Sequence, residues 1–182
     1  MAAGAGTRCV NNLEIPKLVE YLDYFNIMTY DMASSERSSH HTSLYKSDKN
    51  SSICGDEAIR LYNAAGVPFE KLIIGAAFYA RVYENVDGIN CPYDGGFPPG
   101  FGKGYAGTQE RVKTAGGVQY DEQAEAPYIY DANTRTFITF DNERSIRAKR
   151  AYAEKNGLAG LMFWEYASDG AESQLVNAMA DR

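Results

Sequence analysis

Apolar residues gather in three short continuous runs, at residues 24–30, 71–77 and 158–164. A run of this length without a helical period is typical of a strand that is buried on both faces of a parallel sheet. Helices are predicted before, between and after these runs, over residues 15–22, 56–65, 143–155 and 171–180. Strands that alternate with helices imply an α/β fold with a parallel sheet covered on its faces.

The end signals of the third helix are the clearest in the chain. Asp141 and Asn142 can cap its first turn, and Asn156-Gly157 can close it in the left-handed conformation. Pro16 is tolerated in the first turn of the helix predicted over residues 15–22. We therefore expect these helix boundaries to hold closely.

Three other segments have weak or mixed patterns. The Ser-rich stretch 34–52 is expected to be a loop, and residues 84–119 are dense in Gly and Pro without a usable period. Residues 128–140 alternate in part, which predicts a hairpin or edge strands.

The spacing of the strands predicts part of a larger fold. One strand–helix unit of an eightfold barrel takes roughly 31 residues, and the second and third apolar runs lie much farther apart than that. The surplus matches residues 82–136, which we expect to form a small inserted subdomain. Three strands cannot close a barrel.

Composition excludes several classes of function. The net charge of −6 opposes a nucleic acid or an anionic membrane as the main partner. The 45% hydrophobic content argues against disorder, and no apolar stretch is long enough to span a membrane. Cys9, Cys54 and Cys91 make neither a disulfide framework nor a zinc site, and their redox state stays open. His40 and His41 are adjacent and diverge on an extended backbone, so we predict no metal site and no cofactor.

The unusual feature is the aromatic content, with 14 Tyr, 8 Phe and 1 Trp. Tyr combines a flat apolar face with a hydroxyl, which suits sugars and peptides, although part of this content can equally be core. In parallel α/β folds, reactive groups gather where strands end. The strand ends therefore decide between the two interpretations.

The first predicted strand ends in a phenol and a carboxylate, Tyr30 and Asp31, beside the thioether of Met28. Alternation directs Met28 and Tyr30 to one face and Thr29 and Asp31 to the other, unless the strand breaks there. This set can hold a polar substrate against an apolar wall. The alternative is a core tyrosine followed by a turn-forming aspartate.

The other two strands end in similar chemistry. Tyr79 and Arg81 follow the second strand, and Arg81 is either a substrate donor or the partner of a nearby carboxylate. Trp164, followed by Glu165, ends the third, where the indole either stacks on a sugar ring or seals the core. Such chemistry at three consecutive strand ends favours a function over packing alone.

These strand ends resemble the motifs of one family. Residues 24–31, YFNIMTYD, resemble the sixth-strand motif of glycoside hydrolase family 18, the chitinases. Residues 71–81, KLIIGAAFYAR, are similar to their seventh strand, and GLAGLMFWE at 157–165 to their eighth. Shorter similarities link residues 1–6 to the end of the fifth strand, 120–128 to the end of the insertion subdomain and 140–146 to the last helix.

The resemblance implies an incomplete TIM (β/α)8 barrel, roughly from strand five or six to strand eight, with a small α+β insertion subdomain. The barrel portions are then residues 1–81 and 137–182, and the insertion is 82–136. The resemblance also implies an extracellular protein whose partner is chitin or N-acetylglucosamine oligosaccharides.

The same resemblance assigns roles to four strand-end residues. In this family the substrate's own acetamide attacks the anomeric carbon, an exception to the two-carboxylate scheme. Tyr30 would donate a hydrogen bond to the acetamide as charge develops, and Asp31 would bind the sugar beside it. Met28 would line the wall, and Trp164 would form the floor under the sugar.

Three further residues are assigned to the border of the site. Tyr79 and Arg81 would flank the sugar, and Glu165 would be a further contact rather than an acid in its own right.

One departure from the family pattern is decisive. The motif D-x-x-D-x-D-x-E, which supplies the family's proton donor, is absent from residues 1–182. We therefore expect the donor to lie upstream of Met1 and the chain alone to be inactive. The alternatives are a chitin-binding, lectin-like member without hydrolysis, or an interaction module. Two unpaired sheet edges predict self-association or an amino-terminal barrel half as partner.

Overall fold

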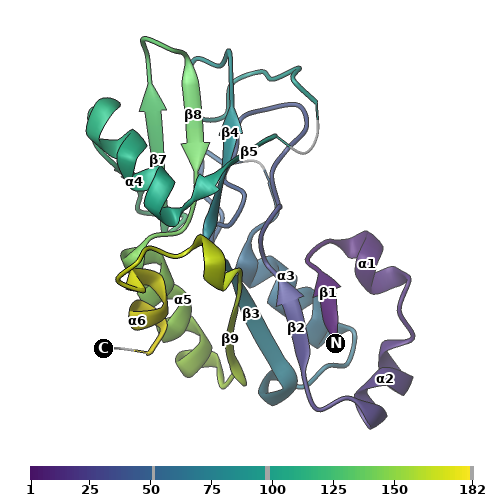
Figure 1. Cartoon of the computed structure of the whole chain (residues 1–182). Coiled ribbons are helices and arrows are strands. Elements are labelled where there is room, and N and C mark those ends of the chain that lie inside the picture. Colours follow the sequence, from purple (N-terminus) through teal and green to yellow (C-terminus); the bar gives the residue numbers. More distant parts are fainter. Residues whose placement is uncertain (51, 97–98, 181–182) are drawn as a thin grey trace.

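The computed structural model describes residues 1–50, 52–96 and 99–180, and these residues form two sheets (Figure 1). The first is a parallel sheet in the order β1-β2-β3-β9, and the second is an antiparallel sheet in the order β5-β4-β8-β7-β6. The strands of the parallel sheet are β1 (Ala2–Gly4), β2 (Phe25–Met28), β3 (Leu72–Ala77) and β9 (Gly160–Trp164). Those of the antiparallel sheet are β4 (Tyr79–Tyr83), β5 (Gly100–Gly104), β6 (Gln119–Asp121), β7 (Ala126–Asp131) and β8 (Thr136–Thr139).

The helices are placed between these strands along the chain. They are α1 (Thr7–Asn11), α2 (Ile15–Tyr21), α3 (Gly55–Ala64), α4 (Tyr105–Thr114), α5 (Glu143–Asn156) and α6 (Gln174–Ala180). Short 3-10 turns occupy η1 (Phe69–Lys71) and η2 (Tyr166–Ser168). The three predicted strands are thus observed as β2, β3 and β9.

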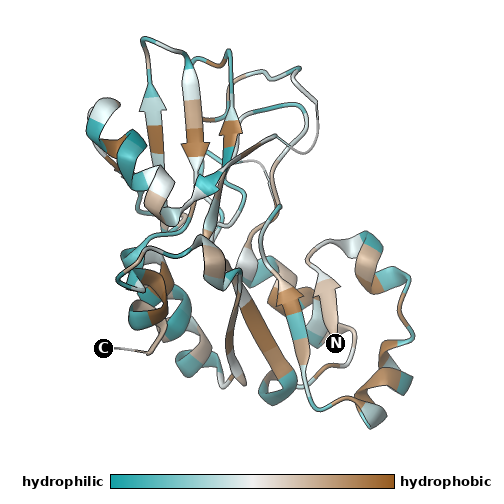
Figure 2. Ribbon diagram, viewed as in Figure 1, coloured by the Kyte–Doolittle hydropathy of each residue, from teal (hydrophilic) through white to brown (hydrophobic). Residues whose placement is uncertain are grey.

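The apolar runs form the core of the parallel sheet. Phe25, Ile27, Leu72 and Ile74 are fully buried, and Tyr62 of α3 packs in the same cluster. The corresponding parts of β2 and β3 are among the most hydrophobic of the ribbon (Figure 2). Burial on both faces explains why these strands appear in the sequence as continuous apolar runs.

The ends of α5 follow their sequence signals. The side chain of Asn142 accepts a hydrogen bond from the Ser145 main-chain N–H at 3.0 Å, which satisfies a free donor of the first turn. Gly157 ends the helix with φ of 67°, the left-handed conformation expected of it. The last helix, α6, begins at Gln174 rather than at residue 171.

Residues 84–119, which have no usable period, contain the strand β5 and the helix α4. In β5 the sequence is Gly-Phe-Gly-Lys-Gly, so no alternation of apolar side chains marks the strand. In α4 only Tyr105 and Thr108 are buried, which is too little for an amphipathic stripe. The predicted hairpin near residues 128–140 is observed as the antiparallel pair β7 and β8.

The polar segment 34–52 is a loop, but its middle part lies inside the molecule. Its described residues form only isolated bridges, and all residues from Ser38 to Leu44 are buried. Ser39 Oγ and the Tyr83 hydroxyl are 3.0 Å apart, and Thr42 donates to the carbonyl of Thr29 at 3.2 Å. Such contacts satisfy the polar groups that burial removes from water.

A buried ion pair joins this loop to β3 and α5. Lys149 of α5 donates to Asp141 Oδ2 and to Thr42 Oγ1, each at 2.6 Å, and neither charged side chain is more than 1% exposed. Asp141 also accepts the Ala77 main-chain N–H at 2.9 Å and the Ser145 hydroxyl at 2.7 Å. The pair therefore fixes the end of β3, the start of α5 and the interior loop to one another.

No helix among the described residues has both the length and the apolar character needed to cross a membrane.

We expect Lys149→Met to lower the free energy of unfolding by about 3–5 kcal/mol, because it leaves the Asp141 carboxylate buried without its counter-charge. Denaturant unfolding followed by circular dichroism measures this change. The control is Lys113→Met on α4, whose partner Glu110 is equally exposed, since surface ion pairs contribute little. Equal effects of the two substitutions on the free energy of unfolding would contradict a larger contribution from the buried pair than from the surface pair.

Candidate functional site

The chain leaves the regular strand geometry directly after β2. Thr29 is fully buried, and its hydroxyl donates to the Gly75 carbonyl at 2.7 Å and accepts the Gly75 N–H at 2.9 Å. A β-carbon at Gly75 would lie 2.8 Å from the Ile27 carbonyl oxygen and 3.0 Å from the Tyr30 ring. The absent side chain at position 75 thus lets Tyr30 pack directly on β3.

Asp31 does not continue the alternation of the strand. Its φ is 56°, in the left-handed region, so its carboxylate no longer shares a direction with Thr29. The alternation of side chains therefore ends before Asp31, which is the exception that the sequence analysis allowed for.

The Asp31 carboxylate is clamped by Arg81 from the antiparallel sheet. Arg81 Nε donates to Oδ1 at 2.7 Å and Nη2 donates to Oδ2 at 2.9 Å, a two-pronged pair. The Arg81 side chain is 11% exposed and that of Asp31 is 39% exposed. Of the two roles predicted for Arg81, partner of a nearby carboxylate is the one observed.

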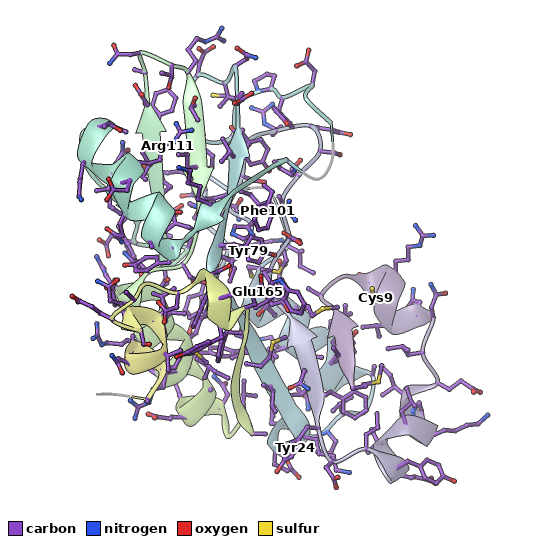
Figure 3. The ribbon with its side chains drawn as sticks, in the orientation of Figure 1. Cys9, Tyr24, Tyr79, Phe101, Arg111 and Glu165 are labelled. Carbon is purple, nitrogen blue, oxygen red and sulfur yellow. The ribbon has the colours of Figure 1, made fainter. Side chains whose placement is uncertain are left out.

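An aromatic series runs from β2 across to the antiparallel sheet. Tyr30 meets Tyr79 edge-on at 6.1 Å between ring centroids, and Tyr79 stacks on Phe101 at 5.2 Å. Tyr79 is almost fully buried, whereas Phe101 of β5 is 65% exposed (Figure 3). Sequence analysis missed Phe101, because an isolated Phe between glycines gives no strand signal.

His41 is the second residue that sequence analysis missed. Its ring is fully buried against Tyr79, at 5.3 Å between centroids, and its Nδ1 lies 3.7 Å from Asp31 Oδ1. His40, its neighbour, turns away and lies 3.3 Å from Asp121. The expected divergence of the two rings is confirmed, but nothing in the sequence indicates which of the two rings lies at the site.

The ionisation of these groups is shifted by their surroundings. Burial acts to raise the pKa of Asp31, but the two hydrogen bonds from Arg81 outweigh it and hold that pKa well below its usual range. Burial, reinforced by the charge of Asp31, raises the pKa values of Tyr30 and Tyr79. At neutral pH the site thus holds a carboxylate and two phenols that keep their protons as donors.

A hollow of about 400 Å³ opens beside these groups on the β1 side. Met28, Tyr30 and Asp31 line it, together with Gly4 at the end of β1 and the next two residues, Ala5 and Gly6. The structure therefore brings three of the seven predicted site residues to one cavity, while Tyr79 and Arg81 reach Asp31 from another side.

Trp164 and Glu165 lie at the same edge of the parallel sheet, at the end of β9. Trp164 pairs with Ala77 in register, its carbonyl accepts the Phe78 N–H at 2.8 Å, and its side chain is 55% exposed. The peptide bond to Glu165, whose position is labelled in Figure 3, is cis. Neither residue lines the 400 Å³ hollow. Met162, two residues earlier, links β9 to the site, because the Tyr30 hydroxyl lies 3.9 Å from its sulfur.

Phenols, a clamped carboxylate and an exposed indole suit a neutral ligand with apolar faces and many hydroxyl groups. Among the described residues, no three His, Cys, Asp or Glu side chains come together in a way that could hold a metal ion. The three cysteines are free thiols.

Comparison with known proteins gives a consistent result. The family model of Glycosyl hydrolases family 18 matches residues 1–169. Chitinase 1 of Aphanocladium album is 32% identical over 170 residues, which cover 91% of this chain and 40% of that protein.

Solved structures match over nearly the whole chain. A family 18 N-acetylglucosaminidase from Paenibacillus barengoltzii superimposes with a TM-score of 0.86 and 35% identity, covering 99% of this chain and 54% of that one. A group IV chitinase from Ostrinia furnacalis in complex with allosamidin gives 0.87 and 27% identity, covering 99% and 55%. The chain thus spans about half the length of these structures, and it belongs to glycosyl hydrolase family 18.

Proposed function

We propose that this chain is the carboxy-terminal part of a chitinase that hydrolyses β-1,4-linked N-acetylglucosamine polymers. In this proposal the parallel sheet is an incomplete TIM barrel, corresponding to roughly the last four of its eight strands. The antiparallel sheet with α4 is the insertion subdomain, with domain limits near residues 1–81, 82–136 and 137–182. The observation that carries the proposal is the cluster of Tyr30, Asp31 and Arg81 at the strand ends of a family 18 chain.

The geometry supports a division of roles within that cluster. Tyr30 keeps its proton and borders the hollow, so it can donate to the acetamide oxygen and hold that nucleophile in line with the anomeric carbon. Asp31 is ionised and held in place by Arg81, so it can accept hydrogen bonds from a sugar without moving.

Apolar contacts complete the proposed sugar site. Met28 lines the hollow, and the exposed indole of Trp164 offers a flat face at the same sheet edge. Tyr79 packs edge-on against Tyr30, and Glu165, next to Trp164, would be a further contact for the sugar. A sugar ring presents C–H groups that pack on such surfaces.

The proton donor is the part of the reaction that this sequence does not supply. The motif D-x-x-D-x-D-x-E is absent from residues 1–182, so we propose that the acid comes from a portion of the barrel outside this sequence. The chain alone would then bind but not cleave. Matched relatives named as chitinases favour hydrolysis by the whole protein over a lectin. An extracellular location remains a prediction.

Tyr30→Phe in the whole protein should reduce kcat for N-acetylglucosamine oligomers by about 100-fold, because the donor that orients the attacking acetamide is lost. Steady-state hydrolysis assays measure the change. The matched control is Tyr24→Phe. Tyr24 is exposed and directly precedes the first residue of β2, at the end of the strand far from the site (Figure 3). If hydrolysis survives Tyr30→Phe unchanged, the assigned role of Tyr30 is wrong.

The isolated chain should self-associate, because β1 and β9 are the edge strands of the parallel sheet and each carries unpaired main-chain groups. Light scattering over a range of concentrations should show a mass that rises with concentration. A monomer whose mass does not change with concentration would argue against uncovered edges.

A further inference from the structure

His41 is a buried imidazole next to the proposed sugar site, and the mechanism above does not use it. Its side chain is fully buried, and the main-chain N–H of Asp31 donates to its Nδ1 at 3.4 Å. Its main-chain carbonyl accepts the N–H of Met32 at 3.0 Å. One residue therefore holds two consecutive main-chain groups just after β2.

Asp31 needs such support because of its backbone. A residue other than glycine at φ of 56° has left the favoured regions, and it stays there only when its surroundings fix it. Arg81 binds only the carboxylate oxygens of Asp31. The contact with His41 Nδ1 is the one that acts on the main chain, and so on the direction in which the carboxylate leaves it.

Both the main chain and the ring of His41 are in contact with the antiparallel sheet. Its main-chain N–H donates to the hydroxyl of Thr139 at 3.2 Å, and its ring packs on Tyr79. Burial lowers the pKa of His41, which favours the neutral ring with one nitrogen free to accept. Besides Asp31, the charged groups that influence the pKa of His41 are Asp141, which raises it, and Lys149, which lowers it.

We propose that His41 is a positioning residue for the sugar site: neutral Nδ1 accepts the Asp31 N–H and so aims the Asp31 carboxylate at Arg81. The proposal rests on the proposed function only where sugar binding is the readout. In this tautomer Nε2 carries the ring proton and has no hydrogen-bond partner among the described residues, so the hydrogen bond at Nδ1 is the one that orients the ring.

Two polar substitutions separate the two nitrogens of the ring. In His41→Asn the side-chain amide places an acceptor close to the position of Nδ1, whereas in His41→Gln the polar atoms lie near Nε2. The matched control is His40→Gln. His40 is equally buried and is adjacent, but it contacts Asp121 and not the site.

The first readout is the NMR resonance of the Arg81 Nε–H, which reports its hydrogen bond to Asp31. We expect His41→Gln to shift or broaden this resonance, and His41→Asn and His40→Gln to leave it near its wild-type position. An unchanged resonance in His41→Gln overturns the proposal. An equal change in His40→Gln does so too, because any buried histidine would then have the same effect.

The second readout is binding of the N-acetylglucosamine tetramer by calorimetry to this chain, which lacks the motif of the proton donor and is therefore expected not to cleave the tetramer. We expect His41→Gln to weaken it about tenfold, with affinity restored by His41→Asn. Wild-type protein that binds no tetramer would refute the proposed function, while the Arg81 resonance would still test the positioning role. Wild-type affinity in His41→Gln would overturn the positioning role alone.

Discussion

The buried ion pair between Lys149 and Asp141 is the interaction on which the rest of the structure depends. It lies where the end of β3, the start of α5 and the interior loop meet, and it is removed from water. Two charges in such a place destabilise the fold unless every lone pair and proton is satisfied. Here Asp141 also accepts hydrogen bonds from Ala77 and Ser145, and Lys149 also donates to Thr42, so the pair specifies how β3, α5 and the interior loop meet.

The candidate site is built on that junction rather than on either sheet alone. The parallel sheet supplies Tyr30 and Asp31 at one strand end, while the antiparallel sheet supplies Tyr79 and Arg81 from β4. The interior loop adds His41 between them. A carboxylate fixed from two sides loses little freedom when a ligand binds, which is the advantage of a site assembled before binding.

The sequence predicts the parts of this molecule that are governed by local rules. Apolar runs locate β2, β3 and β9, and cap residues locate the ends of α5, because burial and helix ends act over a few residues. The β5 strand and the role of His41 depend on neighbours far apart in the chain. Nothing local to Phe101 or His41 shows that Tyr79 stacks on one and packs against the other. The direction of Asp31 likewise follows from a backbone angle, which alternation does not predict.

The close approach of β2 and β3 at Gly75 restricts which substitutions β3 can accept. Its neighbours in β3 are aliphatic and can exchange for one another when the volume is kept, as buried strand positions commonly do. Position 75 has no such latitude, since even a methyl group would meet the Ile27 carbonyl oxygen and the Tyr30 ring. Substitutions elsewhere in β3 are therefore tolerated when the side-chain volume is kept, whereas position 75 has to remain glycine for Tyr30 to pack against this strand.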